Sequence, residues 1–357
     1  IFTIYSISSR NPENNLWTLS LCAILLSNLL IVLIPYLRGY AFSNGGDHLS
    51  HFGWVKFILE TGNLPTDNVY PITHILISQF SLILGVPPDI TINFAGPLFY
   101  LLFVLFTYTL SREILPRNAA ILAVTASTPL FCYYYSEVFP MGFAFLTFPL
   151  VFYLYFSYLK KRLVRFAIIL MPFILLMPLF HPVAASMLVL SLLIYEISKF
   201  LFRTLPSTHE VCQYFSTIPV TLILPIISFI ALVFWMWQNF LVWDSSISCM
   251  VNWFKLEFSN TPLVENAVES FNMLSLSTFE ILNLFIKMYG HYFIYALLAF
   301  IGTLLTFKKE RFGIDDYRKY LFLYSCFFLP AAFIWITDYI FPLTGLTSGR
   351  FIWLVAA

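Results

Sequence analysis

The chain has 357 residues, of which 60% are apolar and only 10% are charged, and its formal net charge is +1. Soluble domains usually carry about 25% charged residues, and a water-soluble core of this size would not bury forty Phe and twenty-one Tyr. The composition therefore excludes an ordinary soluble domain and predicts an all-α polytopic membrane protein, because helices satisfy their own backbone polar groups in lipid. No basic stripe or glycine-rich phosphate loop is present, so no nucleic-acid partner is expected. The five cysteines show no metal-ligand spacing.

Apolar runs long enough to cross about 30 Å of hydrocarbon predict about nine complete transmembrane helices and a truncated tenth that starts at Phe351. The predicted spans are 17–37, 90–110, 118–135, 140–158, 165–181, 183–202, 216–237, 290–307 and 319–340. We assign them to a single transmembrane domain over 1–357 with a large extracytoplasmic loop at 238–289. We expect the chain to be a fragment whose C-terminal part is missing.

The run 69–86 is apolar, but its polar residues His74, Ser78 and Ser81 share one helical face. This pattern indicates an amphipathic helix over about 70–85 that lies at the membrane surface and does not cross it. The positive-inside rule favours this interpretation. With a cytoplasmic N-terminus, 14 of the 19 Lys and Arg residues fall inside and 5 outside, whereas a crossing at 69–86 would leave 4 inside and 15 outside.

Two short apolar runs flank His181-Pro182, and we interpret them as a hairpin whose tip is recessed below the outer surface. A polar group at membrane depth is costly, which makes His181 a candidate functional residue. The alternative is a histidine that caps a helix or pairs two helices.

The first extracytoplasmic loop, 38–89, contains the main candidate residues. A helix is predicted over about 47–61, with Gly62 ending it. Asp47 begins this helix, either as its N-cap or as a general base or metal ligand at the membrane surface. His51 follows one turn later, so it shares a face with Asp47.

Two further candidates lie outside this loop. Glu137 follows Tyr133-Tyr134-Tyr135-Ser136 in a short outer turn. It is either a solvated loop carboxylate or part of a site that Tyr135 helps to line. Arg350 stands at the outer start of the last run, where it either reaches lipid headgroups or binds a phosphate by a forked contact.

This arrangement resembles the GT-C glycosyltransferases, a superfamily that includes protein O-mannosyltransferases, the aminoarabinose transferases of lipid A and oligosaccharyltransferases. The shared features are an N-terminal span, a long outer loop with an early acid and two surface helices, and a short outer loop with a second acid. The run GGDHLSHFGWVKFILETGNLP…YPITH is similar to the first-loop pattern of prokaryotic GT-C-like proteins. SEVFPMGFAF and LFHPVAASMLVL also look like segments of that superfamily.

The resemblance implies transfer of a sugar from a polyprenyl- or dolichyl-phosphate donor to a glycan, lipid or protein acceptor, on the extracytoplasmic side of the cell membrane. Asp47 matches the first-loop aspartate and Glu137 the acid of the second outer loop, and both are expected to be catalytic. Asp47 is followed by His48 and Leu49 and not by an Asp-x-Asp pattern, which favours metal-independent chemistry with Asp47 as the base. If a divalent metal (Mg or Mn) is used, Asp47 and Glu137 are its expected ligands.

Substrate contacts are expected from His48, His51, Tyr70, His74, Tyr135, His181 and Arg350. Two other classes of protein stay open. The first is a multi-pass transporter or flippase for a lipid-linked or polar solute, for which a helix break at Asn93, Gly96 and Pro97 is the main indication. The second is a structural assembly subunit that keeps the fold without the activity.

Overall fold

The computed structural model of the chain describes residues 16–40, 47–66, 68–115, 117–127, 140–161, 163–203 and 220–239, together with positions 277, 279, 280, 282, 283 and 286. The chain divides into two compact units, the first formed by Ile1–Lys199 with Cys212–Trp237 and the second by Phe200–Val211 with Gln238–Ala357. Almost all described residues lie in the first unit, which contains the site. A single transmembrane domain over 1–357 stays a prediction.

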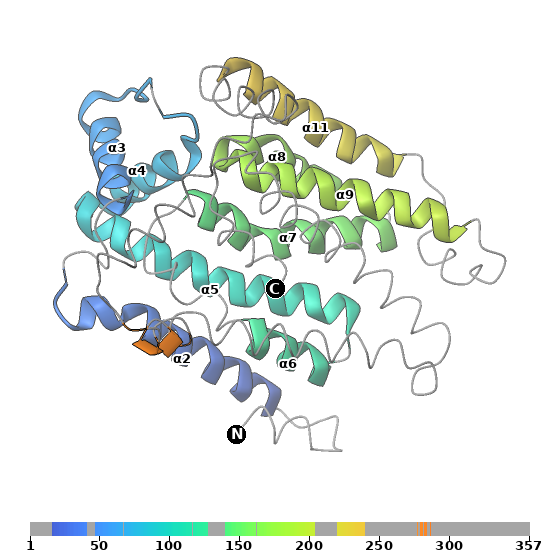
Figure 1. The fold of residues 1–357 in the computed structure, drawn as a ribbon, viewed down its shortest axis with the longest axis horizontal. Helices are drawn as coiled ribbons and strands as arrows, with labels where there is room; N and C mark the ends of the chain where they lie inside the picture. Colours follow the sequence, from blue (N-terminus) through green and yellow to red (C-terminus); the bar gives the residue numbers. More distant parts are fainter. Residues whose placement is uncertain are drawn as a thin grey trace. The chain divides into compact units, whose positions relative to one another are not determined.

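Every regular element among the described residues is a helix (Figure 1). The helices are α2 (Leu16–Leu37), α3 (Asp47–Thr61), α4 (Ile72–Leu84), α5 (Pro88–Ile114), α6 (Arg117–Ser127), α7 (Pro140–Lys161), α8 (Val164–Phe180), α9 (Pro182–Arg203) and α11 (Val220–Gln238). Within the part of the chain that the structure describes, three segments are long and apolar enough to cross a membrane, namely Thr18–Leu37, Pro88–Glu113 and Pro140–Lys161. Together with the composition, they define a membrane-embedded helical protein.

The predicted runs coincide with helices where both can be compared, but only those at α2, α5 and α7 are helices long enough to cross a membrane, and α8, α9 and α11 contain shorter apolar helices. Helices α2, α5, α7, α8, α9 and α11 each coincide with one predicted run to within a few residues. Helix α6 covers the first part of the run predicted at 118–135, and the remainder lies outside the described residues. The runs at 290–307, 319–340 and from Phe351 also lie outside them.

Helices α5 and α7 run in the same direction and pack side by side. The ring of Phe99, near the middle of α5, stacks on Phe143, near the start of α7, with centroids 4.1 Å apart. About four turns later, Glu113 of α5 meets Lys160 of α7 at 3.0 Å. Helix α8 follows α7 after a very short connection and packs against it, so it runs back in the opposite direction.

The chain reverses again at His181. Helix α8 ends at Phe180, His181 is extended with φ −169°, and α9 begins at Pro182, in the first helical position, which suits a residue without a backbone N–H. The His181 ring lies 5.4 Å from Tyr70, beside the first-loop helices. Farther along α9, Glu196 accepts a hydrogen bond of 2.7 Å from Tyr155 in the second half of α7. The predicted break at His181-Pro182 is therefore confirmed, while its depth relative to a membrane stays a prediction.

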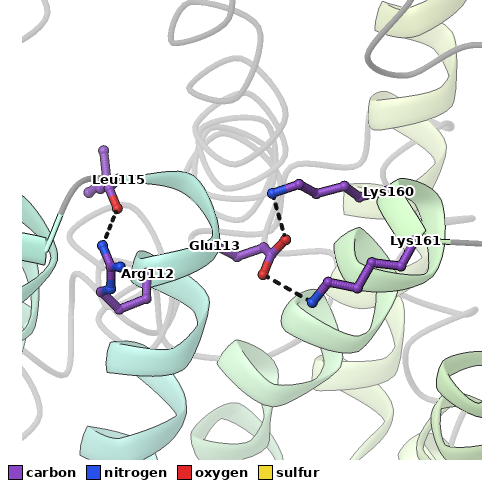
Figure 2. Close-up of polar contacts among 5 residues, drawn as sticks. All are labelled: Arg112, Glu113, Leu115, Lys160 and Lys161. Atoms are coloured by element: carbon purple, nitrogen blue, oxygen red, sulfur yellow. Dashed lines mark hydrogen bonds and ion pairs between the residues drawn. The ribbon is translucent and has the colours of Figure 1, made fainter.

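The end of the helices farthest from His181 carries a cluster of charges (Figure 2). Here the Glu113 carboxylate lies between two ammonium groups, 3.0 Å from Lys160 Nζ and 3.5 Å from Lys161 Nζ. Arg112 donates a 3.1 Å hydrogen bond to the Leu115 carbonyl, at a helix C-terminus where a cation is electrostatically favoured. The ion pairs tie the ends of α5 and α7 together.

This cluster predicts a stability effect that differs from that of an exposed pair. The Glu113 side chain is only 14% exposed, so solvent screens its ion pairs less than those of an exposed carboxylate. Glu113→Gln removes the counter-charge of both lysines. We expect the unfolding free energy in detergent to fall by about 1 kcal/mol, measured by chemical denaturation. Glu60→Gln is the matched control, because its 3.6 Å pair with Lys56 joins side chains that are 62% and 58% exposed. Equal losses in both variants would contradict a specific role for Glu113.

Candidate functional site

The segment predicted as the first outer loop, called the first loop below, contains the two helices that the sequence predicts. Helix α3 covers Asp47–Thr61 as expected and gives way to Gly62, whose φ of +70° is a conformation that glycine adopts without strain. Helix α4 covers Ile72–Leu84 and ends at Gly85 in the left-handed conformation, where the Gly85 N–H bonds to Ser81 O. Glycine residues therefore end both helices, as is common at helix C-termini.

Helix α4 turns its polar side inward. His74, Ser78 and Ser81 are buried on one face, as their spacing predicts, and Ser78 Oγ reaches the Val55 carbonyl of α3 at 3.4 Å. The exposed residues at its end are apolar instead, namely Leu82, Ile83 and Leu84, with exposures of 71%, 78% and 60%. A helix with buried polar groups and an exposed apolar tip suits a lipid-facing environment better than water.

A chain of three buried side chains joins α3 to α4. His51 Nδ1 lies 2.9 Å from His74 Nε2, and His74 Nδ1 lies 2.9 Å from the Asn68 amide nitrogen. His51 is 6% exposed, His74 0% and Asn68 8%. These hydrogen bonds fix the crossing of the two helices, because buried polar groups are costly without partners.

Aromatic rings surround this chain. Trp54, one turn after His51 on α3, packs edge-on against His74 with ring centroids 4.9 Å apart. The Tyr70 ring lies 6.1 Å from Trp54 and 6.4 Å from His51, and it lies 5.4 Å from His181. We call His51, Trp54, Asn68, Tyr70, His74 and His181 the histidine cluster.

His48 occupies a different place from His51. It is 0% exposed and forms a hydrogen bond with Asn93 of α5. Burial lowers the pKa of His48, and the bond to Asn93 partly offsets that shift. His48 therefore joins α3 to α5.

The protonation state of His74 follows from its surroundings. Burial, followed by repulsion from His51, lowers the pKa of His74 from 6.5 to about 3. The ring is therefore neutral at physiological pH and does not supply a positive charge for a phosphate. Full burial gives His74 a positioning role, while Tyr70 and His181, both half-buried, keep surface that a substrate can reach.

Three residues of this region carried no signal in the sequence. Asn68 and Trp54 look like ordinary loop and helix residues until the turn between α3 and α4 brings them to His74. Trp235 of α11 donates its indole N–H to the carbonyl of Val69, the residue before Tyr70, at 2.8 Å. Trp235 and Val69 are 166 residues apart in the sequence. A pair so distant in sequence leaves no periodicity to detect.

The remaining predicted site residues are not placed by the structure. Asp47 is the first residue of α3, but its side chain lies outside the described part of the chain. Glu137, Tyr135 and Arg350 also lie outside it, so their catalytic and binding roles stay predictions. Of the seven predicted substrate contacts, the structure brings together His51, Tyr70, His74 and His181.

Within the described residues, no group of three or more His, Cys, Asp or Glu side chains is arranged to hold a metal ion. The expected ligands of a divalent metal, Asp47 and Glu137, are not among the described side chains. Helical architecture and apolar surface place the chain in the class of integral membrane proteins. A comparison with known families and with curated proteins finds no match to this sequence.

The pKa of His74 predicts a dependence of stability on pH. Between pH 6.5 and about 3, the unfolded chain binds a proton that folded His74 rejects. His74 therefore does not lower the free energy of unfolding above pH 6.5. Below pH 6.5 the free energy of unfolding falls by up to about 1.4 kcal/mol per pH unit. In His74→Gln, whose amide can donate to His51 but does not titrate, we expect a smaller loss between pH 7.5 and 5.5, measured by denaturation in detergent. An unchanged pH dependence would contradict the assignment to His74.

Proposed function

We propose that the protein is a GT-C-like membrane glycosyltransferase, which moves a sugar from a polyprenyl- or dolichyl-phosphate donor to a glycan, lipid or protein acceptor on the extracytoplasmic side. The proposal rests mainly on the contact between a residue of the first loop and the residue at the break between α8 and α9. Tyr70 and His181 come from these separate elements, and their rings lie 5.4 Å apart. Such a junction, at one end of the helices, is suited to a reaction at the membrane surface.

The distribution of charge supports the orientation. Arg112, Lys160, Lys161 and Arg165 lie at the ends of α5 and α7 and the start of α8, the end opposite the histidine cluster. Cytoplasmic loops carry the excess of Lys and Arg. The histidine cluster then faces away from the cytoplasm, with α3 and α4 as the two interfacial helices of a multi-pass chain of about nine spans and a tenth.

The proposed chemistry uses one base and one cation. Asp47 accepts the proton of the acceptor hydroxyl as its oxygen attacks the anomeric carbon of the sugar. The bond from that carbon to the phosphate oxygen breaks, and the lipid phosphate leaves with the electron pair. Arg350 offsets the charge that grows on the phosphate, and Glu137 and Tyr135 complete the site. If Mg or Mn takes part, Asp47 and Glu137 are the residues that would hold it.

The position of the aromatic rings supports sugar binding in particular. Tyr70 offers an apolar ring face and a hydroxyl group from the same half-buried side chain, which suits the mixed surface of a sugar. Trp54 packs against Tyr70 at 6.1 Å and limits the directions its ring can take. The lipid tail of the donor stays in the bilayer, beside the exposed apolar tip of α4.

A multi-pass transporter or flippase is the second candidate. Its main sequence indication weakens, because α5 continues without interruption through Gly96 and Pro97 and Asn93 joins His48. One observation favours it: Glu196 of α9 is 6% exposed, in an apolar helix. Ionisable residues inside membranes often mark transport paths.

The proposed orientation predicts opposite cysteine accessibility at the two ends. In a variant without the native cysteines, Glu60→Cys, at an exposed position of α3, should react with a membrane-impermeant maleimide in intact cells. Val164→Cys, at a site 67% exposed beside the basic end, should react only after permeabilisation. Labelling of both positions in intact cells would contradict the proposed topology. Labelling in permeabilised cells is the control that each thiol is accessible to the reagent.

The proposed activity predicts a specific loss in Asp47→Asn. Proteoliposomes with radiolabelled polyprenyl-phosphate sugars should show transfer by the wild type, reduced at least a hundredfold in Asp47→Asn, because the acceptor loses its base. Asp89→Asn, an exposed acid in the first turn of α5, is the matched control and should stay active. Survival of transfer in EDTA would support the metal-free mechanism, and its loss would make Asp47 a metal ligand. If a folded wild type transfers no sugar from any donor, the second candidate takes precedence.

A further inference from the structure

We propose that the basic end of α7 and α8 binds the phosphate of an anionic phospholipid, and that an acyl chain of this lipid lies along the exposed apolar side of α8. Lys161, the last residue of α7, and Arg165, in the first turn of α8, are the residues that contact the phosphate. The site lies at the end of the helices opposite the histidine cluster, so it does not depend on the proposed function.

The basic end lies at the depth of the lipid headgroups. Two segments that are long and apolar enough to cross a membrane end here, one at Glu113 and the other at Lys161, and ion pairs join their ends (Figure 2). Helix α7 has 22 residues, which gives a length of about 33 Å, slightly more than the roughly 30 Å of hydrocarbon in a bilayer. Lys161 therefore lies close to the phosphates of one leaflet.

Cations outnumber acids at this end. The Glu113 carboxylate lies 3.0 Å from Lys160 Nζ and 3.5 Å from Lys161 Nζ, so one negative charge faces two positive charges. The Lys161 ammonium and the Arg165 guanidinium lie 5.3 and 5.4 Å from the centroid of the same ring, that of Phe166. The sequences of α6, α7 and α8 contain no Asp or Glu. Because like charges repel each other, an anion beside Lys161 and Arg165 stabilises this arrangement.

Both cations are accessible from outside the helices. The Lys161 side chain is 38% exposed, and Arg165 is exposed as well. A guanidinium group carries five N–H donors and binds phosphate oxygens through charge-assisted hydrogen bonds, often two at a time. A phosphate can therefore approach Lys161 and Arg165 together from the lipid side.

An exposed apolar stripe continues from Arg165 along α8. Ile169 and Leu176 follow Arg165 by one turn and by three turns of helix, and they are 51% and 39% exposed. Beside them lie Ile168 and Leu175, with exposures of 66% and 48%. From Arg165 to Leu176 the stripe is about 16 Å long, close to the roughly 15 Å of hydrocarbon in one leaflet. Charge at one end and an apolar strip of this length fit a phospholipid better than a soluble anion.

The preference for an anionic lipid follows from the charge of the headgroup. The phosphate of phosphatidylcholine is linked to a choline cation, which Lys161 and Arg165 repel, whereas the phosphate of phosphatidylglycerol has no attached cation. Basic side chains beside a membrane surface attract anionic lipids, and each Lys or Arg contributes about fivefold in affinity.

Native mass spectrometry of the full chain in detergent tests this preference. The protein is mixed with equal amounts of phosphatidylglycerol and phosphatidylcholine that carry the same acyl chains. We expect the wild type to retain more phosphatidylglycerol, and Arg165→Gln and Lys161→Gln each to lower the ratio of the two bound lipids about fivefold. Arg165→Lys keeps the charge and should keep most of the preference. Equal binding of both lipids by the wild type would overturn the proposal.

Lys56→Gln is the matched control. It also removes one exposed cation, but Lys56 lies on α3, near the histidine cluster, where its side chain is 58% exposed and pairs with Glu60. We expect the ratio of bound lipids to stay unchanged in this variant. An equal fall of the ratio in Lys56→Gln and in Arg165→Gln would show that the ratio follows net charge alone, and it would overturn the assignment to α7 and α8.

Glycerol phosphate distinguishes a lipid site from a site for soluble anions, because it carries a phosphate without acyl chains. Added in excess to the wild type, it should leave phosphatidylglycerol bound, since it makes no contact with the apolar stripe of α8. Displacement of phosphatidylglycerol by glycerol phosphate would overturn the lipid assignment. A preference that is unchanged in high salt would also contradict the proposal, because salt screens charges at an exposed surface.

Discussion

The hydrogen bond between His51 and His74 is the contact on which the first-loop structure depends. In a chain this apolar, hydrophobic burial favours no particular helix pair in lipid, because acyl chains solvate leucine as well as another helix does. Specific pairing must then come from polar atoms that need partners. The same constraint appears elsewhere in the described residues, for example where Tyr100 donates to Asn28 at 2.7 Å between α5 and α2 and where Tyr155 of α7 donates to Glu196 of α9. Each bond connects two helices at buried side chains.

The helices could be predicted from the sequence, and the contacts between them could not. The bounds of α3 followed from Gly62, and the buried face of α4 from the spacing of His74, Ser78 and Ser81. The pairing of His51 with His74 spans 23 residues and depends on the path of the turn between α3 and α4, which local patterns do not specify. The same holds for Asn68, which looks like a loop residue until its amide reaches His74.

Buried histidines changed the interpretation of the site more than any other feature. From the sequence, His48, His51 and His74 were equal candidates for substrate contact. Their environments separate them: His48 joins α3 to α5 through Asn93, and His74 lies within the chain that ends at His51. Tyr70 and His181 are only half-buried, and they come from different parts of the chain. Burial thus divides one cluster into fully buried side chains and side chains that keep some accessible surface.

The bond from Trp235 to the Val69 carbonyl has a consequence for the order in which the protein is made. During synthesis, α3 and α4 emerge about 150 residues before α11, and chain growth at about 5–20 residues per second makes that interval several seconds or more. Throughout this time the segment before α4 lacks the indole that later holds it. The first loop therefore reaches its final form only after α11 has been inserted, and a ribosome stalled before α11 would display α3 and α4 on a membrane without a completed site.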